Sequence, residues 1–271
     1  MKIGFLGGGN MANALIGGLL AKGTTRPQDI AVVDVSPAAR ERLGEKHGVR
    51  VTTAPDAAMQ GTEVIVLAVK PQNMKTALAS ISGFSSHKLV ISIAAGITLE
   101  ALSRWLGGHR RLVRCMPNTP ALIGAGISAL YALPEVDSSE KEKAEAILAA
   151  VGEVVWVPEE RLLDPVTAVS GSGPAYVFWF MEQLAASGQK LGLSEETSRR
   201  LALQTVLGAA KLAAASDEPI DVLRKNVTSK GGTTEAALKV FDEEKLAERL
   251  ARALEAASRR GAEMGAELGK D

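Results

Sequence analysis

The sequence predicts an α/β protein with a doubly wound sheet in residues 1–159 and an all-helical region in residues 160–271. Short apolar runs alternate with helical patterns up to residue 157, which is typical of parallel sheets. A glycine-rich turn joins the first apolar run to the first helical pattern. After Pro158 no stretch has the pattern of a strand. We therefore expect two domains that divide at residue 159.

The first predicted strand, Lys2–Leu6, leads directly into Gly7–Ala12, which fits the pattern G-x-G-x-x-A. A helix is expected next, at Asn13–Lys22. A strand, a glycine turn and a helix in this order form the phosphate-binding corner of a Rossmann dinucleotide fold. The glycines allow a sharp turn and a close approach of backbone to a pyrophosphate, and the helix N-terminus attracts its charge. The residues expected to contact the cofactor are Gly7, Gly9, Asn10 and Met11.

The rest of the first domain continues the alternation. Ser36 followed by Pro37 is typical of a helix start, and Ser139 with Glu142 forms a capping-box pattern. Residues 63–69 are almost entirely apolar, as in a strand buried on both faces. Further strands are expected at residues 30–35, 49–51, 63–69, 89–93, 111–116, 126–131 and 154–157, and helices at 37–46, 55–60, 71–81, 99–106 and 139–151.

Residues 160–271 show helical patterns only. The helix that opens at Pro174 is apolar nearly all round, so it must be covered on several sides. Thin, alanine-rich helices supply little cover, which favours a homodimer interface in this region. Ser172 or Gly173 is expected to cap this helix. Helices are expected at residues 164–169, 174–191, 194–215, 219–227, 234–241 and 243–268.

Composition and charge exclude several classes of protein. Thirty-one basic and thirty-one acidic residues cancel, so no basic field is available for nucleic acid or an anionic membrane. The apolar run Leu89–Ile97 is too short to span a bilayer. The single cysteine, Cys115, excludes an internal disulfide and fits a reducing, cytoplasmic compartment. His47, His87 and His109 lie in polar stretches without ligand spacing, so we expect no metal site and no histidine catalyst.

Asp34 ends the second predicted strand. A carboxylate at this position accepts hydrogen bonds from the ribose hydroxyls of a dinucleotide and repels a 2′-phosphate, which favours NADH over NADPH. The alternative role for Asp34 is to cap the turn before Ser36. Arg40 and Arg42 follow within a turn or so and can reach a phosphate, so NADPH stays open.

Three more stretches follow strands at the carboxyl edge of the predicted sheet, where open α/β sheets bind ligands. They are residues 68–71, 92–96 and 115–120. Lys70 can reach a cofactor or substrate, and Asn118 can present an amide to one. The alternatives are a surface lysine and a structural turn.

Val227–Thr234 contains two glycines, four hydroxyl side chains and one lysine before a predicted helix. The backbone N–H groups of Gly231, Gly232 and Thr233, together with Ser229 and Lys230, suit a carboxylate. An ordinary helix cap is the alternative, but a cap needs one hydroxyl rather than four.

With these motifs together, the chain resembles the pyrroline-5-carboxylate reductases over essentially its whole length. The resemblance implies hydride transfer from NADH or NADPH to the C=N carbon of 1-pyrroline-5-carboxylate, which gives L-proline in the last step of proline biosynthesis. It also implies a Rossmann domain, an all-helical dimerisation domain with interlaced subunits, and often a decamer of five dimers. The matching segments are residues 5–12, 68–71, 92–96, 116–120, 170–176 and 227–234.

The resemblance also implies roles for single residues. Thr234 would hydrogen-bond the imine nitrogen, and the amides of Gly231, Gly232 and Thr233 would hold the substrate carboxylate. Glu160 would lie near the substrate and Asn226 near the nicotinamide half of the cofactor. The residues implied to line the cofactor are Val69, Lys70, Pro71, Ala95 and Asn118.

Two departures from the family pattern concern ligand binding. Many members carry proline where Lys230 stands. Many carry Ser, Thr or Asn where Asp34 stands, and this second departure puts a preference for NADPH in doubt here. Two other classes stay open, namely a related imine or 3-hydroxyacid dehydrogenase and a non-catalytic NAD(P)-binding sensor. Hydroxyacid enzymes need a lysine on the helix after the second-domain glycine motif, and Ala175–Met181 has none. A sensor has no need for the stretch Ser229–Thr234.

Overall fold

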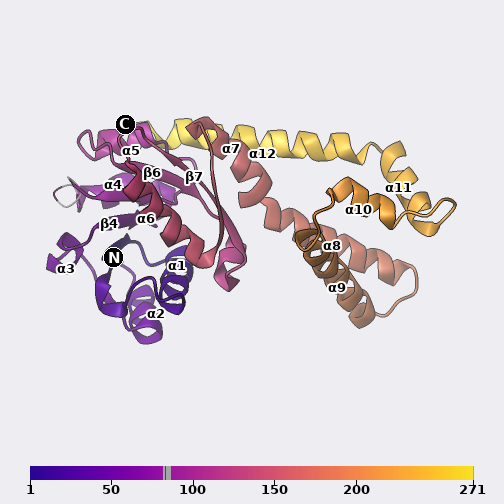
Figure 1. Cartoon of the computed structure of the whole chain (residues 1–271), viewed down its shortest axis with the longest axis horizontal. Coiled ribbons are helices and arrows are strands. Elements are labelled where there is room, and N and C mark those ends of the chain that lie inside the picture. The colour runs from indigo at the N-terminus through magenta and orange to yellow at the C-terminus, as the bar shows by residue number, and fades with distance from the viewer. Residues whose placement is uncertain (82, 84–86, 271) are drawn as a thin grey trace. The chain divides into compact units, whose positions relative to one another are not determined.

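The computed structural model describes residues 1–81, 83 and 87–270. Contacts divide the chain into a sheet unit, Met1–Ser172 with Ala256–Asp271, and a helical unit, Gly173–Glu255. The chain leaves the sheet unit after Ser172 and returns to it within helix α12, Leu246–Leu268 (Figure 1). Residues 160–172 and the end of α12 thus pack with the sheet, so the compact units and the expected functional domains do not coincide.

The strands that the structure describes form one eight-stranded sheet in the order β3-β2-β1-β4-β5-β6-β7-β8. This order confirms the doubly wound α/β class, because the chain starts in the middle of the sheet and winds outward in both directions. The strands are β1 (Ile3–Leu6), β2 (Ile30–Val33), β3 (Arg50–Thr52), β4 (Val64–Leu67), β5 (Leu89–Ser92), β6 (Leu112–Met116), β7 (Gly126–Ala132) and β8 (Gly152–Trp156).

One strand pairing corrects the predicted series of parallel crossovers. Strand β7 runs antiparallel to β6, with Cys115 opposite Leu130, whereas the other neighbouring strands are parallel. The connection between β6 and β7 holds only the 3₁₀ helix η3, Thr119–Ile123. A parallel crossover needs about a dozen residues or more, usually an α-helix, so this connection can only return the chain antiparallel.

Helices cover both faces of the sheet. On one face, buried residues of α1 and α6 pack with Phe5 and Ile91 of the strands. On the other face, residues of α3, α4 and α5 pack with Ile65 and Leu67. The helices of this unit are α1 (Asn10–Ala21), α2 (Pro37–His47), α3 (Ala57–Gln60), α4 (Met74–Ala79), α5 (Leu99–Trp105) and α6 (Ser138–Leu148), with 3₁₀ turns η1 (Pro27–Asp29), η2 (Pro71–Asn73) and η4 (Ala149–Val151).

Local capping explains several helix starts, with one correction. The Ser36 hydroxyl accepts from the Ala39 amide at 3.4 Å, which confirms the predicted start of α2. The capping box of α6 is formed by Asp137 with Glu140, not by Ser139 with Glu142. Asp137 Oδ1 accepts from the Glu140 amide at 2.8 Å, and Glu140 Oε2 accepts from the Asp137 amide at 3.1 Å. Two overlapping patterns of the same spacing occur here, and the earlier one starts the helix.

The segment before α8 also differs from the prediction. Helix α7, Leu163–Val166, continues into a π-helical turn, η6, at Thr167–Gly171. The Ser172 amide donates to Thr167 O at 2.8 Å, which is the hydrogen bond of a π turn. Ser172 and Gly173 therefore lie inside a nearly continuous helical run, so the expected free cap at this position is wrong. The remaining elements are η5 (Glu160–Leu162), α8 (Gly173–Lys190), α9 (Glu195–Ala214), α10 (Ile220–Asn226), α11 (Thr233–Glu243) and α12.

The C-terminal half of α12 packs on the sheet unit through small residues. A Cβ placed on Gly265 would lie 2.7 Å from Gly96 O, so only glycine allows this approach. Arg104 Nη2 donates to Gly269 O at 2.6 Å and holds the end of the helix. In the described part of the chain, no helix is both long and apolar enough to cross a membrane.

Candidate active site

The glycine corner, Gly7–Ala12, has the geometry that the motif predicts. Gly7 has a φ of +102°, and a Cβ there would lie 2.6 Å from Ala68 O on the neighbouring turn. The Gly7 amide donates to Val33 O at 2.8 Å, which places the turn between β2 and β4. A Cβ on Gly9, the first residue before α1, would have open space around it among the described residues. The corner thus combines a strained turn with an uncovered helix N-terminus, which fits a pyrophosphate.

Asp34 is tied to the glycine corner by its side chain. Its Oδ2 accepts from the Gly8 amide at 2.6 Å, and its Oδ1 accepts from the Ser36 amide at 2.7 Å. The turn-capping role is therefore real, and it holds the carboxylate beside the corner. A carboxylate offers about four acceptor positions, so ribose hydroxyls can still bind.

Arg40 and Arg42 both bond backbone carbonyls beside Asp34. Arg40 Nη1 donates to Val35 O at 2.9 Å and to Asp34 O at 3.2 Å. Arg42 Nη2 donates to Gly8 O at 2.8 Å. Both guanidinium groups therefore serve the local backbone in this structure.

The carboxyl ends of β1, β2, β4, β5 and β6 lie side by side in the sheet order. The predicted cofactor residues of the sheet unit follow these ends, so the fold brings them to one edge. Lys70 is exposed there, while Val69, Pro71 and Ala95 are half-buried. The residues at this edge are Gly7, Gly9, Asn10, Met11, Asp34, Val69, Lys70, Pro71, Ala95 and Asn118.

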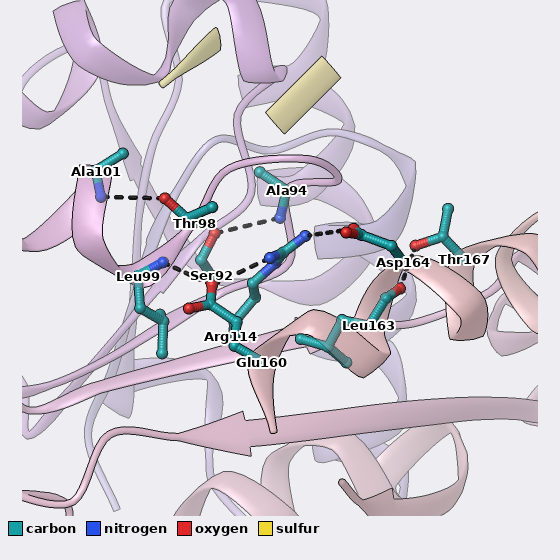
Figure 2. Close-up of polar contacts among 10 residues, drawn as sticks. All are labelled: Ser92, Ala94, Thr98, Leu99, Ala101, Arg114, Glu160, Leu163, Asp164 and Thr167. Carbon is teal, nitrogen blue, oxygen red and sulfur yellow. Dashed lines mark hydrogen bonds and ion pairs between the residues drawn. The ribbon is translucent and has the colours of Figure 1, made fainter. Parts of the chain in front are cut away.

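Arg114 forms a buried ion network that the sequence analysis did not identify (Figure 2). The residue is 5% exposed and lies in the middle of β6. Its Nη1 lies 3.0 Å from Glu160 Oε1, and its Nη2 lies 3.5 Å from Asp164 Oδ1. A charged residue inside the apolar run of β6 was the available sign, because a buried charge requires partners.

Glu160 joins this network to the start of α5. Its Oε1 also accepts from the Leu99 amide at 2.7 Å, next to the Thr98 hydroxyl that caps the helix by accepting from the Ala101 amide (Figure 2). The loop that precedes α5 contains Ala95, one of the predicted cofactor contacts. One oxygen of Glu160, in η5, thus bonds both β6 and the start of α5, the helix that follows the loop with Ala95.

Asn118 and Met116 hold the π turn η6 on the same strand end. Asn118 Nδ2 donates to Ser170 O and to Ser170 Oγ, each at 3.4 Å, and its Oδ1 accepts from the Ile127 amide at 2.9 Å. A Cβ on Gly171 would lie 2.4 Å from Met116 Cε, so the end of the Met116 side chain packs closely against this glycine. The Asn118 amide therefore joins two of the noted motifs, residues 116–120 and 170–176, and its contact with a cofactor stays a prediction.

The predicted substrate residues Ser229, Gly231, Gly232, Thr233 and Thr234 share one turn and the start of α11 in the helical unit. Gly231 has a φ of +73°, and the Gly232 amide donates to Ser229 O at 3.0 Å. Ser229 and Gly232 are in close contact, since a Cβ on Gly232 would lie 2.4 Å from Ser229 Oγ. The turn thus places these residues together at the N-terminus of α11, the positive end of a helix.

Asn226 and Glu160 belong to different units of the structure. Asn226 ends α10 in the helical unit, and its Nδ2 donates to Glu218 Oε2 at 3.0 Å. Glu160 belongs to the sheet unit.

The cysteine and two of the histidines have environments that suit structure rather than catalysis. Burial raises the pKa of the Cys115 thiol, so it stays protonated. Burial lowers the pKa of His47, whose Nε2 lies 2.9 Å from Asn13 Oδ1, and the charge of Lys46 lowers it further. Burial also lowers the pKa of His109.

Comparison with known proteins decides the family. The family described as pyrroline-5-carboxylate reductase dimerisation matches residues 160–264, and the family described as NADP oxidoreductase, coenzyme F420-dependent, matches residues 2–96. A pyrroline-5-carboxylate reductase of Pseudomonas aeruginosa is 46% identical over 241 residues, 89% of this chain and 88% of that protein. The chain belongs to the pyrroline-5-carboxylate reductase family. The resemblance inferred from the motifs is thereby confirmed.

Solved structures of pyrroline-5-carboxylate reductases share the whole fold. The enzyme of Coxiella burnetii is 42% identical, with a TM-score of 0.92 over 97% of this chain and 98% of that one. The enzyme of Plasmodium falciparum, solved with NADP bound, is 31% identical, with a TM-score of 0.86 over 98% of each chain. The Rossmann part of this chain is therefore an NAD(P)-binding domain. This confirms the enzyme class predicted from the sequence, an NAD(P)-dependent oxidoreductase.

The helical part of this family is a dimerisation domain, and the chain forms a homodimer. The helical unit has the surface that this assembly requires. Helix α8 exposes large apolar side chains, and an apolar patch of this kind marks a protein interface. The exposed apolar residues on α8 are Val177, Phe178, Trp179, Phe180 and Leu184.

Proposed function

We propose that the chain catalyses the NAD(P)H-dependent reduction of 1-pyrroline-5-carboxylate to L-proline, the final step of proline biosynthesis. The 46% identity to a pyrroline-5-carboxylate reductase over 89% of the chain carries this proposal. The family matches to residues 2–96 and 160–264 include the glycine corner and the turn Ser229–Thr234 that is assigned to the substrate. Cofactor binding is assigned to residues 1–159, and substrate binding with dimerisation to residues 160–271. The dimerisation match that starts at residue 160 supports this division.

The residues of the sheet unit hold the cofactor. Gly7 and Gly9 admit the pyrophosphate to the N-terminus of α1, where Asn10 and Met11 contribute amides. Asp34 accepts the ribose hydroxyls. A bound nicotinamide supplies the hydride for the C=N carbon of the substrate. The other residues that line the cofactor are Val69, Lys70, Pro71, Ala95 and Asn118, and Asn226 is assigned to the nicotinamide half.

The substrate turn orients the imine rather than protonating it with a strong acid. A cyclic imine can arrive protonated, so its reduction depends on position and on a hydrogen-bond partner. Thr234 provides that partner for the imine nitrogen. Ser229 and the amides of Gly231, Gly232 and Thr233 hold the carboxylate of the substrate.

Glu160 contributes to the substrate site through its second oxygen. Its Oε1 already accepts from Arg114 and from the Leu99 amide. Its Oε2 is the oxygen that remains to face the substrate.

NADH is the preferred coenzyme in this proposal. The Asp34 carboxylate is held at the corner by Gly8 and Ser36, and it would repel the 2′-phosphate of NADPH. Arg40 and Arg42 bond carbonyl oxygens rather than extending toward a phosphate, which supports the same preference.

We also propose that five homodimers form a decamer. The support is the apolar surface of the helical unit together with the family resemblance. Light scattering on the purified protein would give the mass of ten 28.3 kDa chains if the proposal holds, and the mass of two if it fails. A cytoplasmic location stays a prediction from the sequence.

The activity is tested by mixing the purified protein with 1-pyrroline-5-carboxylate and either NADH or NADPH. Loss of cofactor absorbance at 340 nm, together with formation of L-proline, is the expected result. Turnover of a 3-hydroxyacid with NAD⁺ in place of imine reduction would favour the related dehydrogenases. Cofactor binding without turnover of either substrate would favour a sensor.

A further inference from the structure

A carboxylate of the chain already lies on the proposed substrate turn. Glu235 is the third residue of α11, and its Oε2 accepts from the Gly231 amide at 2.7 Å. Gly231 is one of the three residues whose amides are assigned to the substrate carboxylate. The Glu235 side chain therefore lies where an oxygen of the substrate is expected.

The other two amides differ in what they offer. The Gly232 amide already donates to Ser229 O at 3.0 Å, so the substrate carboxylate would share it with a backbone oxygen of the turn. The Thr233 amide is the first of α11, and no side chain in the described part of the chain caps this helix. The Gly231 amide is thus the donor for which the chain and the substrate compete most directly.

Competition at this amide has two physical parts. One backbone N–H makes one strong hydrogen bond, so the two carboxylates cannot both use it fully. Two carboxylates on the same helix end also repel each other, because like charges at short distance raise each other's energy. Glu235 is exposed, so its side chain can leave the turn for water at the cost of about one hydrogen bond.

We propose that Glu235 is a specificity-determining residue that competes with the substrate carboxylate for the Gly231 amide. Glu235 weakens the binding of an imine that carries a carboxylate and leaves the binding of an imine without one unchanged. This inference rests on the proposed function, since it assumes that the turn binds 1-pyrroline-5-carboxylate.

The test compares Glu235→Gln and Glu235→Ala with the unchanged chain in the reductase assay. Glu235→Gln removes the charge and keeps an oxygen acceptor, whereas Glu235→Ala removes both. Glu235→Ala is expected to lower the KM for 1-pyrroline-5-carboxylate about fivefold, the equivalent of one hydrogen bond. Glu235→Gln should lower it less, because its oxygen still competes for the Gly231 amide. The KM for the coenzyme and the kcat should stay unchanged.

Two controls separate competition from helix capping. Glu243→Gln makes the same charge change at the other end of α11, where Glu243 pairs with Lys239 on the surface at 3.8 Å, and it should leave the KM unchanged. Unsubstituted 1-pyrroline, measured as a competing ligand, should keep its inhibition constant in all variants. A residue that only caps the helix would raise the KM when replaced, because the turn would loosen.

The outcomes distinguish the two proposals. If the unchanged chain reduces 1-pyrroline-5-carboxylate and neither Glu235 variant lowers the KM, the role of Glu235 is wrong and the proposed function stands. A raised KM in both variants overturns it in the same way. If the unchanged chain does not reduce 1-pyrroline-5-carboxylate, both proposals fall together.

Discussion

Arg114 and Glu160 form an ion pair within the sheet unit, with Arg114 Nη1 3.0 Å from Glu160 Oε1. The same oxygen accepts from the Leu99 amide at 2.7 Å, so a single atom connects strand β6 with helix α5. Asp164 is a second carboxylate beside the guanidinium, with its Oδ1 3.5 Å from Arg114 Nη2. The network therefore fastens the segment after β8 to the sheet through an arginine side chain that is 6% exposed and two carboxylate side chains that are 23% and 22% exposed.

Replacing Arg114 with methionine is expected to lower the free energy of unfolding by about 3 kcal/mol. Methionine fills much of the volume, but the carboxylates of Glu160 and Asp164 lose their counter-charge, and uncompensated charges away from water are strongly destabilising. Urea denaturation followed by circular dichroism measures the change.

Arg110→Met is the matched control for this substitution. Arg110 pairs with Glu135 on the surface, where the two side chains are 48% and 45% exposed. Exposed pairs contribute about 1 kcal/mol or less, so this variant should be almost as stable as the unchanged protein. Equal losses in the two variants would contradict the role given to the Arg114 network.

The sequence predicted most elements of the fold because their patterns are local. Strand β4 is a continuous apolar run, and the caps at Ser36 and Thr98 mark their helices directly. The antiparallel direction of β7 was missed, although the connection between the strands predicted at 111–116 and 126–131 is too short for a parallel crossover. The π turn at Thr167–Gly171 was missed because its contacts, such as Asn118 with Ser170, join residues far apart in the sequence.

The candidate site, like the fold, could be predicted where its residues are consecutive and not where they are far apart in the sequence. The glycine corner and the turn before α11 were evident because their chemistry lies in consecutive residues. Arg114 and Asp164 were not identified, since their pairing joins residues fifty positions apart. The hydrogen bond from the Gly231 amide to Glu235 was also missed. A glutamate in the first turn of a helix is usual, and this contact is visible only in the fold.

Replacing Gly265 with alanine is expected to destabilise the sheet unit by about 1–3 kcal/mol. The added Cβ would lie 2.7 Å from Gly96 O, so helix α12 must shift away from the loop after β5. Gly261→Ala is the control on the same helix, since its Cβ would meet no described atom closer than Asp164 Oδ1 at 3.7 Å. Alanine there should be neutral or stabilising by up to about 1 kcal/mol. Thermal unfolding that ranks the two variants in the opposite order would refute the close contact.

Replacing Asp34 with serine is expected to raise the use of NADPH relative to NADH. The change removes the negative charge that opposes a 2′-phosphate, an effect of about 1–2 kcal/mol or roughly tenfold in the ratio of kcat/KM values. Asp29→Ser removes the same charge just before the other end of strand β2 and should leave the ratio unchanged. A ratio that is the same for Asp34→Ser and the unchanged protein would show that the carboxylate does not select the coenzyme.

Replacing Thr234 with alanine is expected to lower kcat about a hundredfold while the dissociation constant of the coenzyme stays the same. The hydroxyl is assigned to the imine nitrogen, and a hydrogen-bond partner at the reacting group contributes to the transition state rather than to cofactor binding. Thr234→Ser keeps the hydroxyl and should retain most of the activity, which separates the hydrogen bond from the methyl group. Steady-state kinetics and fluorescence titration with NADH supply the two values. Full turnover by the alanine variant would remove Thr234 from the mechanism.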